Sequence, residues 1–137
     1  MKRYFLLALV PVFALLASLA VACGGGGSAD LPDLATQAAG TQPQTNVTVE
    51  AKALKFNTKT IVVPAKTNIT VTLDNQDGGT LHNIAVYGAK DAKDVIHRAE
   101  LFQGRDSKAE TWESPEAGVY YFRCDAHPDM NGAFIAK

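Results

Sequence analysis

The sequence lacks several features that mark common protein classes. Of its 137 residues, 13 are Lys or Arg and 14 are Asp or Glu, which gives a net charge of −1. Without an excess of basic residues the chain lacks the positive face that nucleic-acid binding requires, so that class of function is excluded. The length is that of one domain with a modest core. No internal repeat is visible, and low complexity is confined to a short Gly/Ser stretch near the N-terminus.

Cysteine is scarce, which excludes a small scaffold held together by several disulfides. The two cysteines, Cys23 and Cys124, lie toward opposite ends of the chain. A single disulfide between them is conceivable in an exported protein. We favour separate roles, because each cysteine has a more specific sequence context.

The one long hydrophobic run is at the N-terminus. Residues 1–22 begin with Met-Lys-Arg and continue with apolar residues, the pattern of a signal peptide. The small residues before Cys23 resemble a bacterial lipobox, which predicts a lipoprotein signal peptide and lipidation of Cys23. The alternatives are an ordinary cleaved signal peptide and an uncleaved helix, since the run is just long enough to span a bilayer. All three place the remaining chain outside the cytoplasm.

Residues 23–45 have the composition of a flexible, disordered linker. Four glycines and a serine follow Cys23, and the next residues are rich in Ala, Thr, Gln and Pro with few large apolar side chains. We therefore expect residues 46–137 to form the folded domain, which the linker holds off the membrane.

From residue 46 onward the pattern is typical of an all-β protein. Short apolar segments with alternating polar residues recur, and Gly-, Asp- and Pro-containing turns separate them. The segments expected to be strands are 47–49, 53–56, 61–63, 69–73, 81–87, 119–124 and 133–136. This spacing favours an antiparallel β-sandwich.

The segment 88–108 shows no clear periodicity. Its central part, 90–101, is charged and predicts a short surface helix or a long loop. His97 lies there without a partner at metal-ligand spacing, so we expect it to be solvated. Trp112 and Phe134 are expected in the core.

Two of the expected strands carry residues with metal-binding chemistry. Alternation places His82 and Cys124 on the inward faces of their strands. His127 and Met130 follow Cys124 at successive steps of three residues. A thiolate, two imidazoles and a thioether are the ligands of a mononuclear blue-copper site. A buried histidine and a buried thiol close together also need a compensating partner, which copper would supply.

Taken singly, each of these residues has a simpler structural explanation. Cys124 could be an inert buried thiol, His127 a surface residue and Met130 core packing. His82 could be a hydrogen-bonded core histidine. The combination of all four at this spacing, in a β-sheet context, favours the metal site.

The segment 118–132, which contains Cys124-Asp-Ala-His-Pro-Asp-Met130, resembles the C-terminal copper loop of the cupredoxins, and its spacing is similar to that of amicyanin. The pair His82-Asn83 resembles the upstream His-Asn pair of the same family. The resemblance covers roughly residues 47–137. It implies a Greek-key β-sandwich or barrel that holds one type 1 copper ion. His82, Cys124 and His127 would be the strong ligands, Met130 the weak axial ligand, and Asn83 would tie the two ligand loops together.

The resemblance implies an electron-transfer protein that shuttles single electrons through Cu(I) and Cu(II) and is not an enzyme. Copper oxidases and nitrite reductases need further His-x-His ligands, and this chain has three histidines. A dinuclear copper site needs two cysteines on one loop, a pattern that is absent. The alternative is a copper chaperone or buffer, which predicts exposed Met and His clusters, whereas the chain has only two methionines.

The expected partner is a redox protein, either a cytochrome c or a membrane electron-transfer complex. Asp125 and Asp129 could meet a basic surface on it, or could be solvated carboxylates without a role. We expect a monomer in the bacterial cell envelope, on the periplasmic side, attached to the membrane through a lipid on Cys23.

Overall fold

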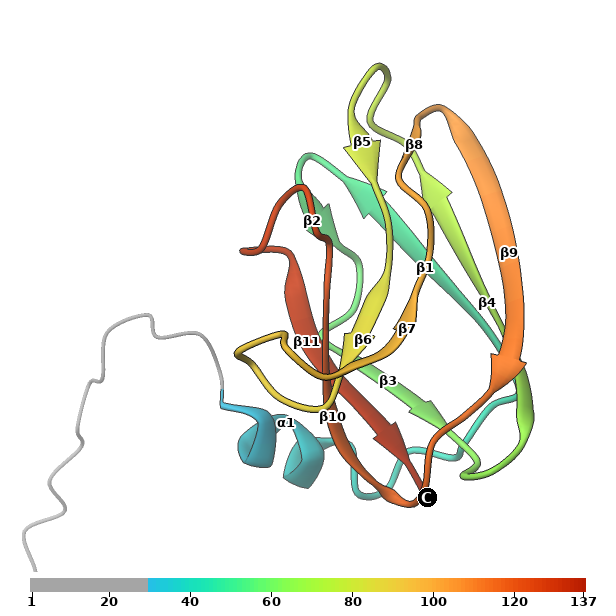
Figure 1. The fold of residues 1–137 in the computed structure, drawn as a ribbon, viewed down its shortest axis with the longest axis vertical. Helices are drawn as coiled ribbons and strands as arrows, with labels where there is room; N and C mark the ends of the chain where they lie inside the picture. The colour runs from blue at the N-terminus through green and yellow to red at the C-terminus, as the bar shows by residue number, and fades with distance from the viewer. Residues whose placement is uncertain (1–29) are drawn as a thin grey trace, which may run out of the picture.

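A computed structural model of the protein describes residues 30–137, in which two β-sheets pack face to face (Figure 1). The predicted signal peptide, the lipidation site Cys23 and residues 23–29 of the predicted linker lie outside the described residues. Within the described part, the structure confirms the all-β prediction.

The first sheet has the strand order β2-β1-β4-β9. Its members are β1 (Asn46–Lys52), β2 (Lys55–Phe56), β4 (Asn68–Asn75) and β9 (Asp106–Glu113). The second sheet has the order β3-β11-β10-β6-β7. Its members are β3 (Thr60–Val63), β6 (Ala85–Tyr87), β7 (Val95–Arg98), β10 (Gly118–Arg123) and β11 (Asn131–Ala136). A separate pair joins β5 (Leu81–His82) to β8 (Phe102–Gln103).

Two strand pairings differ from the antiparallel arrangement that the sequence suggests. β1 runs parallel to β4, and β3 runs parallel to β11. The remaining pairs of named strands are antiparallel. Alternation within one strand shows which face is buried but not the direction of its neighbour, so the parallel pairs could not be inferred from it.

Apolar side chains from both sheets meet in one core. β4 shows the alternation most clearly, because Ile69, Val71 and Leu73 are buried while the intervening threonines are half-buried. Phe122 and Phe134 fill the core from the second sheet, and both are fully buried, as predicted for Phe134. Full burial of such a side chain contributes about 1.5–3 kcal/mol relative to exposure.

The charged segment differs most from its prediction. It contains β7 and leads through β8 into β9, and no part of it is helical. His97 is not solvated: its Nε2 lies 2.8 Å from Glu110 Oε2, and its ring stacks on Trp112 with centroids 3.7 Å apart. Trp112 is half-buried and packs against the core. β9 escaped prediction because most of its side chains are exposed, which removes the apolar alternation that marks a strand.

A helix replaces part of the predicted linker. α1 (Leu31–Gln37) begins with a proline in its first turn and buries Leu34 against Val62 and Ile135. Gln44 continues the contact by donating its backbone N–H to the carbonyl of Val62. A seven-residue helix is not stable alone, so packing against the sheet holds it in place. No helix within residues 30–137 has the length and hydrophobicity needed to cross a membrane.

Candidate metal centre

The candidate site lies where β5 meets the loop between β10 and β11, near the upper end of the molecule in Figure 1. His82 ends β5, and Cys124 follows the last residue of β10. The loop is closed by two backbone hydrogen bonds. Cys124 N–H donates to the carbonyl of Met130 at 2.9 Å, and Met130 N–H donates to the carbonyl of His127 at 2.8 Å. The loop therefore has a fixed shape.

Three predicted ligand residues converge on one point. The Nδ1 atoms of His82 and His127 lie 3.6 Å and 3.7 Å from Cys124 Sγ, and all three donor atoms lie within 4.8 Å of one another. A first-row metal with bonds of about 2.0–2.1 Å to nitrogen and about 2.3 Å to sulfur separates these two atoms by about 3.6–3.8 Å. The observed distances therefore fit one shared metal ion.

The donor atoms differ in exposure. His82 and Cys124 are fully buried, and Met130 is 2% exposed and packs in the same core cluster as Cys124. His127 is half-buried, and its neighbours Ala126 and Pro128 are exposed. His127 is therefore the donor residue that reaches the surface. The combination of two imidazoles, a thiolate and a thioether is the one that type 1 copper prefers.

Asn83 joins the two segments that carry the donor atoms. Its Oδ1 accepts the backbone N–H of Asp125 at 2.8 Å, and its Nδ2 donates to the carbonyl of Ala99 at 2.9 Å. The side chain is buried. It therefore links the residue after His82 to the residue after Cys124.

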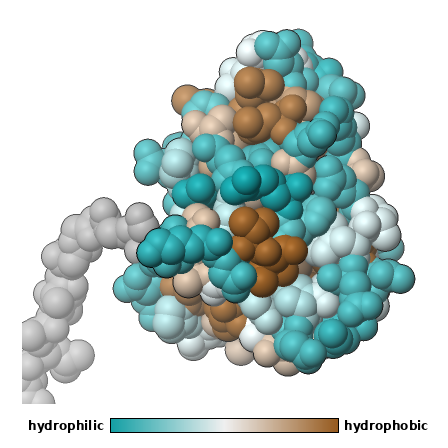
Figure 2. Space-filling model, in the orientation of Figure 1, coloured by the Kyte–Doolittle hydropathy of each residue, from teal (hydrophilic) through white to brown (hydrophobic). Residues whose placement is uncertain are grey.

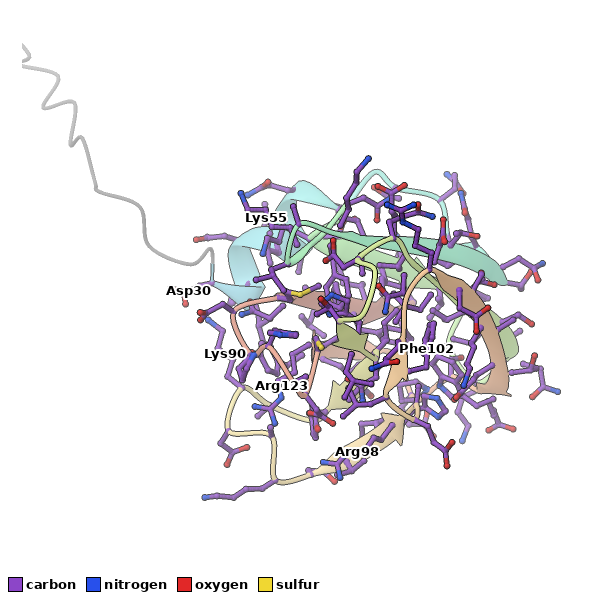
Figure 3. All side chains as sticks on the ribbon, turned by 90° about the horizontal axis from the view of Figure 1, so that it is seen from above. Asp30, Lys55, Lys90, Arg98, Phe102 and Arg123 are labelled. Atoms are coloured by element: carbon purple, nitrogen blue, oxygen red, sulfur yellow. The ribbon has the colours of Figure 1, made fainter. Side chains whose placement is uncertain are left out.

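Asp125 is an internal residue rather than the solvated or partner-facing carboxylate that the sequence suggested. It accepts hydrogen bonds from the Tyr87 hydroxyl at 2.6 Å and from Arg123 Nε at 3.1 Å, and Arg98 Nε lies 3.1 Å away. Arg98 and Arg123 lie on the same side of the molecule in Figure 3. Burial pushes the pKa of Asp125 upward, but hydrogen bonds from Tyr87, Asn83 and Arg123 outweigh it, so the pKa lies below its usual value.

Sequence reasoning did not single out Asp77. The residue belongs to the turn after β4, and its Oδ2 lies 3.0 Å from His82 Nε2. The backbone N–H of Leu54, together with that of Ala53, holds the pKa of Asp77 below its usual value despite partial burial. A carboxylate five residues before a predicted ligand, within a tight turn, is the signal that could have revealed it.

Exposed apolar side chains border the site. Leu54 is 52% exposed, and Leu81 and Leu101 are each 42% exposed. The backbone N–H of Leu54 donates to Asp77, Leu81 precedes His82, and Leu101 precedes the strand that pairs with β5. Figure 2 shows apolar surface near the upper end of this face, the end at which β5 lies in Figure 1.

Known proteins share this architecture. Auracyanin from the photosynthetic bacterium Roseiflexus castenholzii is 21% identical with a TM-score of 0.64, over 70% of this chain and 99% of that one. Auracyanin A from Chloroflexus aurantiacus, described as a blue copper protein, is 21% identical with a TM-score of 0.60, over 70% and 100%. Amicyanin from Paracoccus versutus is 27% identical with a TM-score of 0.50, over 71% and 86%. No curated protein sequence matches the chain.

The sequence also matches a family model. The model of the cupredoxin-like domain covers residues 15–136, which is most of the chain. The match and the architecture agree with the fold class predicted from the copper-loop resemblance. The chain belongs to the cupredoxin-like domain family.

Proposed function

We propose that this protein is a type 1 copper electron carrier in which His82, Cys124, His127 and Met130 bind one copper ion. The observation that carries the proposal is the convergence of two Nδ1 atoms on Cys124 Sγ at 3.6 Å and 3.7 Å. Copper supplies a one-electron couple between Cu(I) and Cu(II) when it is bound.

The chain contributes a rigid and largely dry environment for that couple. His82 and Cys124 are fully buried, and the backbone of the Cys124–Met130 loop is cross-linked by hydrogen bonds. Asn83 and Asp125 tie this loop to the segment that follows β5. A site held from several elements changes little in shape when its charge changes, which favours rapid electron transfer.

His127 is the proposed route for the electron. It is half-buried, and the exposed leucines Leu54, Leu81 and Leu101 border the same end of the molecule. A partner that docks there by apolar contact brings its redox centre close to the imidazole. Partners of this kind are a cytochrome c or a membrane electron-transfer complex.

The proposal includes a location. The N-terminal sequence supports lipidation of Cys23 and attachment of a monomeric domain to the periplasmic side of a bacterial membrane. The copper chaperone or buffer alternative requires ligands that exchange readily at the surface. Three of the four proposed ligands are at most 2% exposed, which favours the carrier.

Spectroelectrochemistry of the copper-loaded protein tests the proposal. The carrier is expected to show an intense visible thiolate-to-Cu(II) band that disappears on reduction and returns on oxidation, with copper retained through repeated cycles. Cys124→Ser is expected to abolish the band while leaving the fold intact. Absence of the band, or release of copper on each reduction, would overturn the proposed function and favour copper handling.

A further inference from the structure

We propose that Asp77 is a positioning residue that fixes the tautomer of His82 and favours the oxidised form of the bound copper. The inference rests on the proposed function of the site. It goes beyond the four ligands, because it assigns a role to a side chain on a different turn that contacts no other donor residue among the hydrogen bonds of the described residues.

The His82 ring is oriented by contacts at both of its nitrogen atoms. Its Nε2 lies 3.0 Å from Asp77 Oδ2, and its Nδ1 lies 3.6 Å from Cys124 Sγ. An ionised carboxylate only accepts hydrogen bonds, so Nε2 carries the ring proton. Nδ1 is then the atom with the free lone pair, and it faces the thiol. The carboxylate thus selects the tautomer that can bind a metal beside Cys124.

The Asp77 carboxylate is held in place by two backbone N–H groups. Its Oδ1 accepts the backbone N–H of Ala53 at 2.7 Å, and its Oδ2 accepts that of Leu54 at 3.0 Å. Both residues have positive φ, 52° and 57°, in the turn between β1 and β2. This conformation is uncommon for residues other than glycine, and it aims two successive N–H groups at one acceptor. Asp77 is therefore anchored by backbone rather than by mobile side chains.

The backbone of Asp77 is also held in place. Its N–H donates to Asn75 Oδ1 at 3.0 Å, and Asn75 Nδ2 donates to the carbonyls of Thr80 and Phe102. Gly104 packs directly against this turn, since a Cβ at its position would lie 2.7 Å from the carbonyl oxygen of Asp77. The turn has little room to shift, so the distance to His82 is fixed from both sides.

The two histidines consequently differ in how strongly each can donate an electron pair to a bound metal. His82 has a carboxylate on the ring nitrogen that faces away from the site, whereas the hydrogen bonds of His127 within residues 30–137 include no carboxylate partner. A carboxylate that accepts a hydrogen bond from the distal ring nitrogen makes the other nitrogen a stronger electron-pair donor to the metal. Stronger donation and a nearby negative charge both favour Cu(II) over Cu(I), which lowers the reduction potential.

The reduction potential of Asp77→Asn tests this role, with Asp74→Asn as the matched control. Asp74 lies in the preceding strand, and its carboxylate accepts from Gln76 Nε2 at 2.7 Å. In Asp77→Asn the preference for Cu(II) over Cu(I) is expected to fall about tenfold or more. Tenfold corresponds to a rise of about 59 mV for a one-electron couple. The control is expected to keep the wild-type potential, and an unchanged potential in Asp77→Asn would overturn the inference.

A second measurement needs neither copper nor a variant. Nitrogen-15 NMR of the copper-free, full-length protein is expected to show His82 protonated at Nε2, and protonation at Nδ1 would overturn the inference. This readout also separates the two proposals. If the chain bound no copper, the proposed function would fail, while the tautomer would still decide whether Asp77 orients the ring.

Discussion

Cys124 stands at the boundary between the core and the loop that carries His127 and Met130. Its side chain packs among core residues, while its backbone N–H closes the loop on Met130. Cys124 is thus both a core residue and the first residue of the loop that carries the other two candidate ligands. Its neighbour Asp125 secures the position by joining strands β6, β7 and β10 through Tyr87, Arg98 and Arg123.

Replacement of Asp125 by alanine is expected to destabilise the copper-free protein. The Tyr87 hydroxyl is buried and loses its acceptor, which costs about 1–3 kcal/mol in the free energy of unfolding. Urea denaturation measures the change. Asp129→Ala removes an exposed carboxylate from the same loop and serves as the control. Equal stability of the two variants would show that the Asp125 network contributes nothing.

The lowered pKa of Asp125 and of Asp77 predicts the response of the copper-free protein to acid. In the unfolded chain an aspartate titrates at about 3.9. Between that value and the lower folded-state pKa, the unfolded chain binds more protons, so stability falls as the pH falls. The contribution of the two carboxylates to the free energy of unfolding is complete above about pH 5. It is lost progressively as the pH falls below about 4 and through the folded-state pKa. Urea midpoints measured from about pH 5 downward should fall less steeply with pH in Asp125→Asn than in the wild type. Parallel curves for the two proteins would contradict the lowered pKa of Asp125.

At the residue scale, the sequence points to candidate ligands where their spacing carries the information, and the structure brings His82, Cys124 and His127 together. His82, Cys124, His127 and Met130 stand out because a thiol, imidazoles and a thioether recur at short steps beside a strand. Asp77 did not stand out, because its importance depends on a turn from another part of the chain that supplies two backbone N–H groups. The sequence alone offers only the position of this carboxylate, in a tight turn five residues before His82.

At the scale of elements, strands with one buried face were predictable and strands with little burial were not. β4 has buried Ile, Val and Leu at alternate positions, whereas β9 pairs with it over its whole length and exposes most of its side chains. The strand exists because β4 offers a free edge, not because of its own sequence. The prediction that His97 is solvated was wrong because β9 was not predicted. Its contacts, Glu110 and Trp112, both lie on that strand.

Helix α1 gives a test at the element scale. Leu34→Ala is expected to lower the free energy of unfolding by about 2–5 kcal/mol, because the side chain is buried against Val62, Ala133 and Ile135. Urea denaturation of the copper-free protein measures the loss. Leu54→Ala, at an exposed leucine, should change stability by no more than about 0.5 kcal/mol. A loss for Leu34→Ala as small as that of the control would mean that α1 does not dock on the sheet.

For the whole molecule, the candidate site and the first of the described residues lie on different elements. α1 packs on β10 and β11, while the site is built by β5 and the β10–β11 loop (Figure 1). Lys90 pairs with Asp30 at 2.9 Å, just before the helix.

The tether itself is a prediction at this scale. Mass spectrometry of the mature protein is expected to find Cys23 as the first residue, carrying lipid, because small residues precede it. Cys23→Ser should abolish the modification and release the protein from membranes. A mature N-terminus at another residue, or an intact N-terminal segment, would favour a cleaved signal peptide or a spanning helix instead.

The central claim is that one copper ion binds between His82, His127 and Cys124. X-ray absorption at the copper edge tests it most directly, on the full-length protein in both oxidation states. The expected result is one sulfur ligand at short distance and two imidazole nitrogens around copper, in Cu(II) and Cu(I) alike. In Cys124→Ser the short copper–sulfur distance is expected to be absent from the spectrum. A copper ion surrounded only by nitrogen and oxygen atoms, or one that exchanges its ligands on reduction, would contradict the claim.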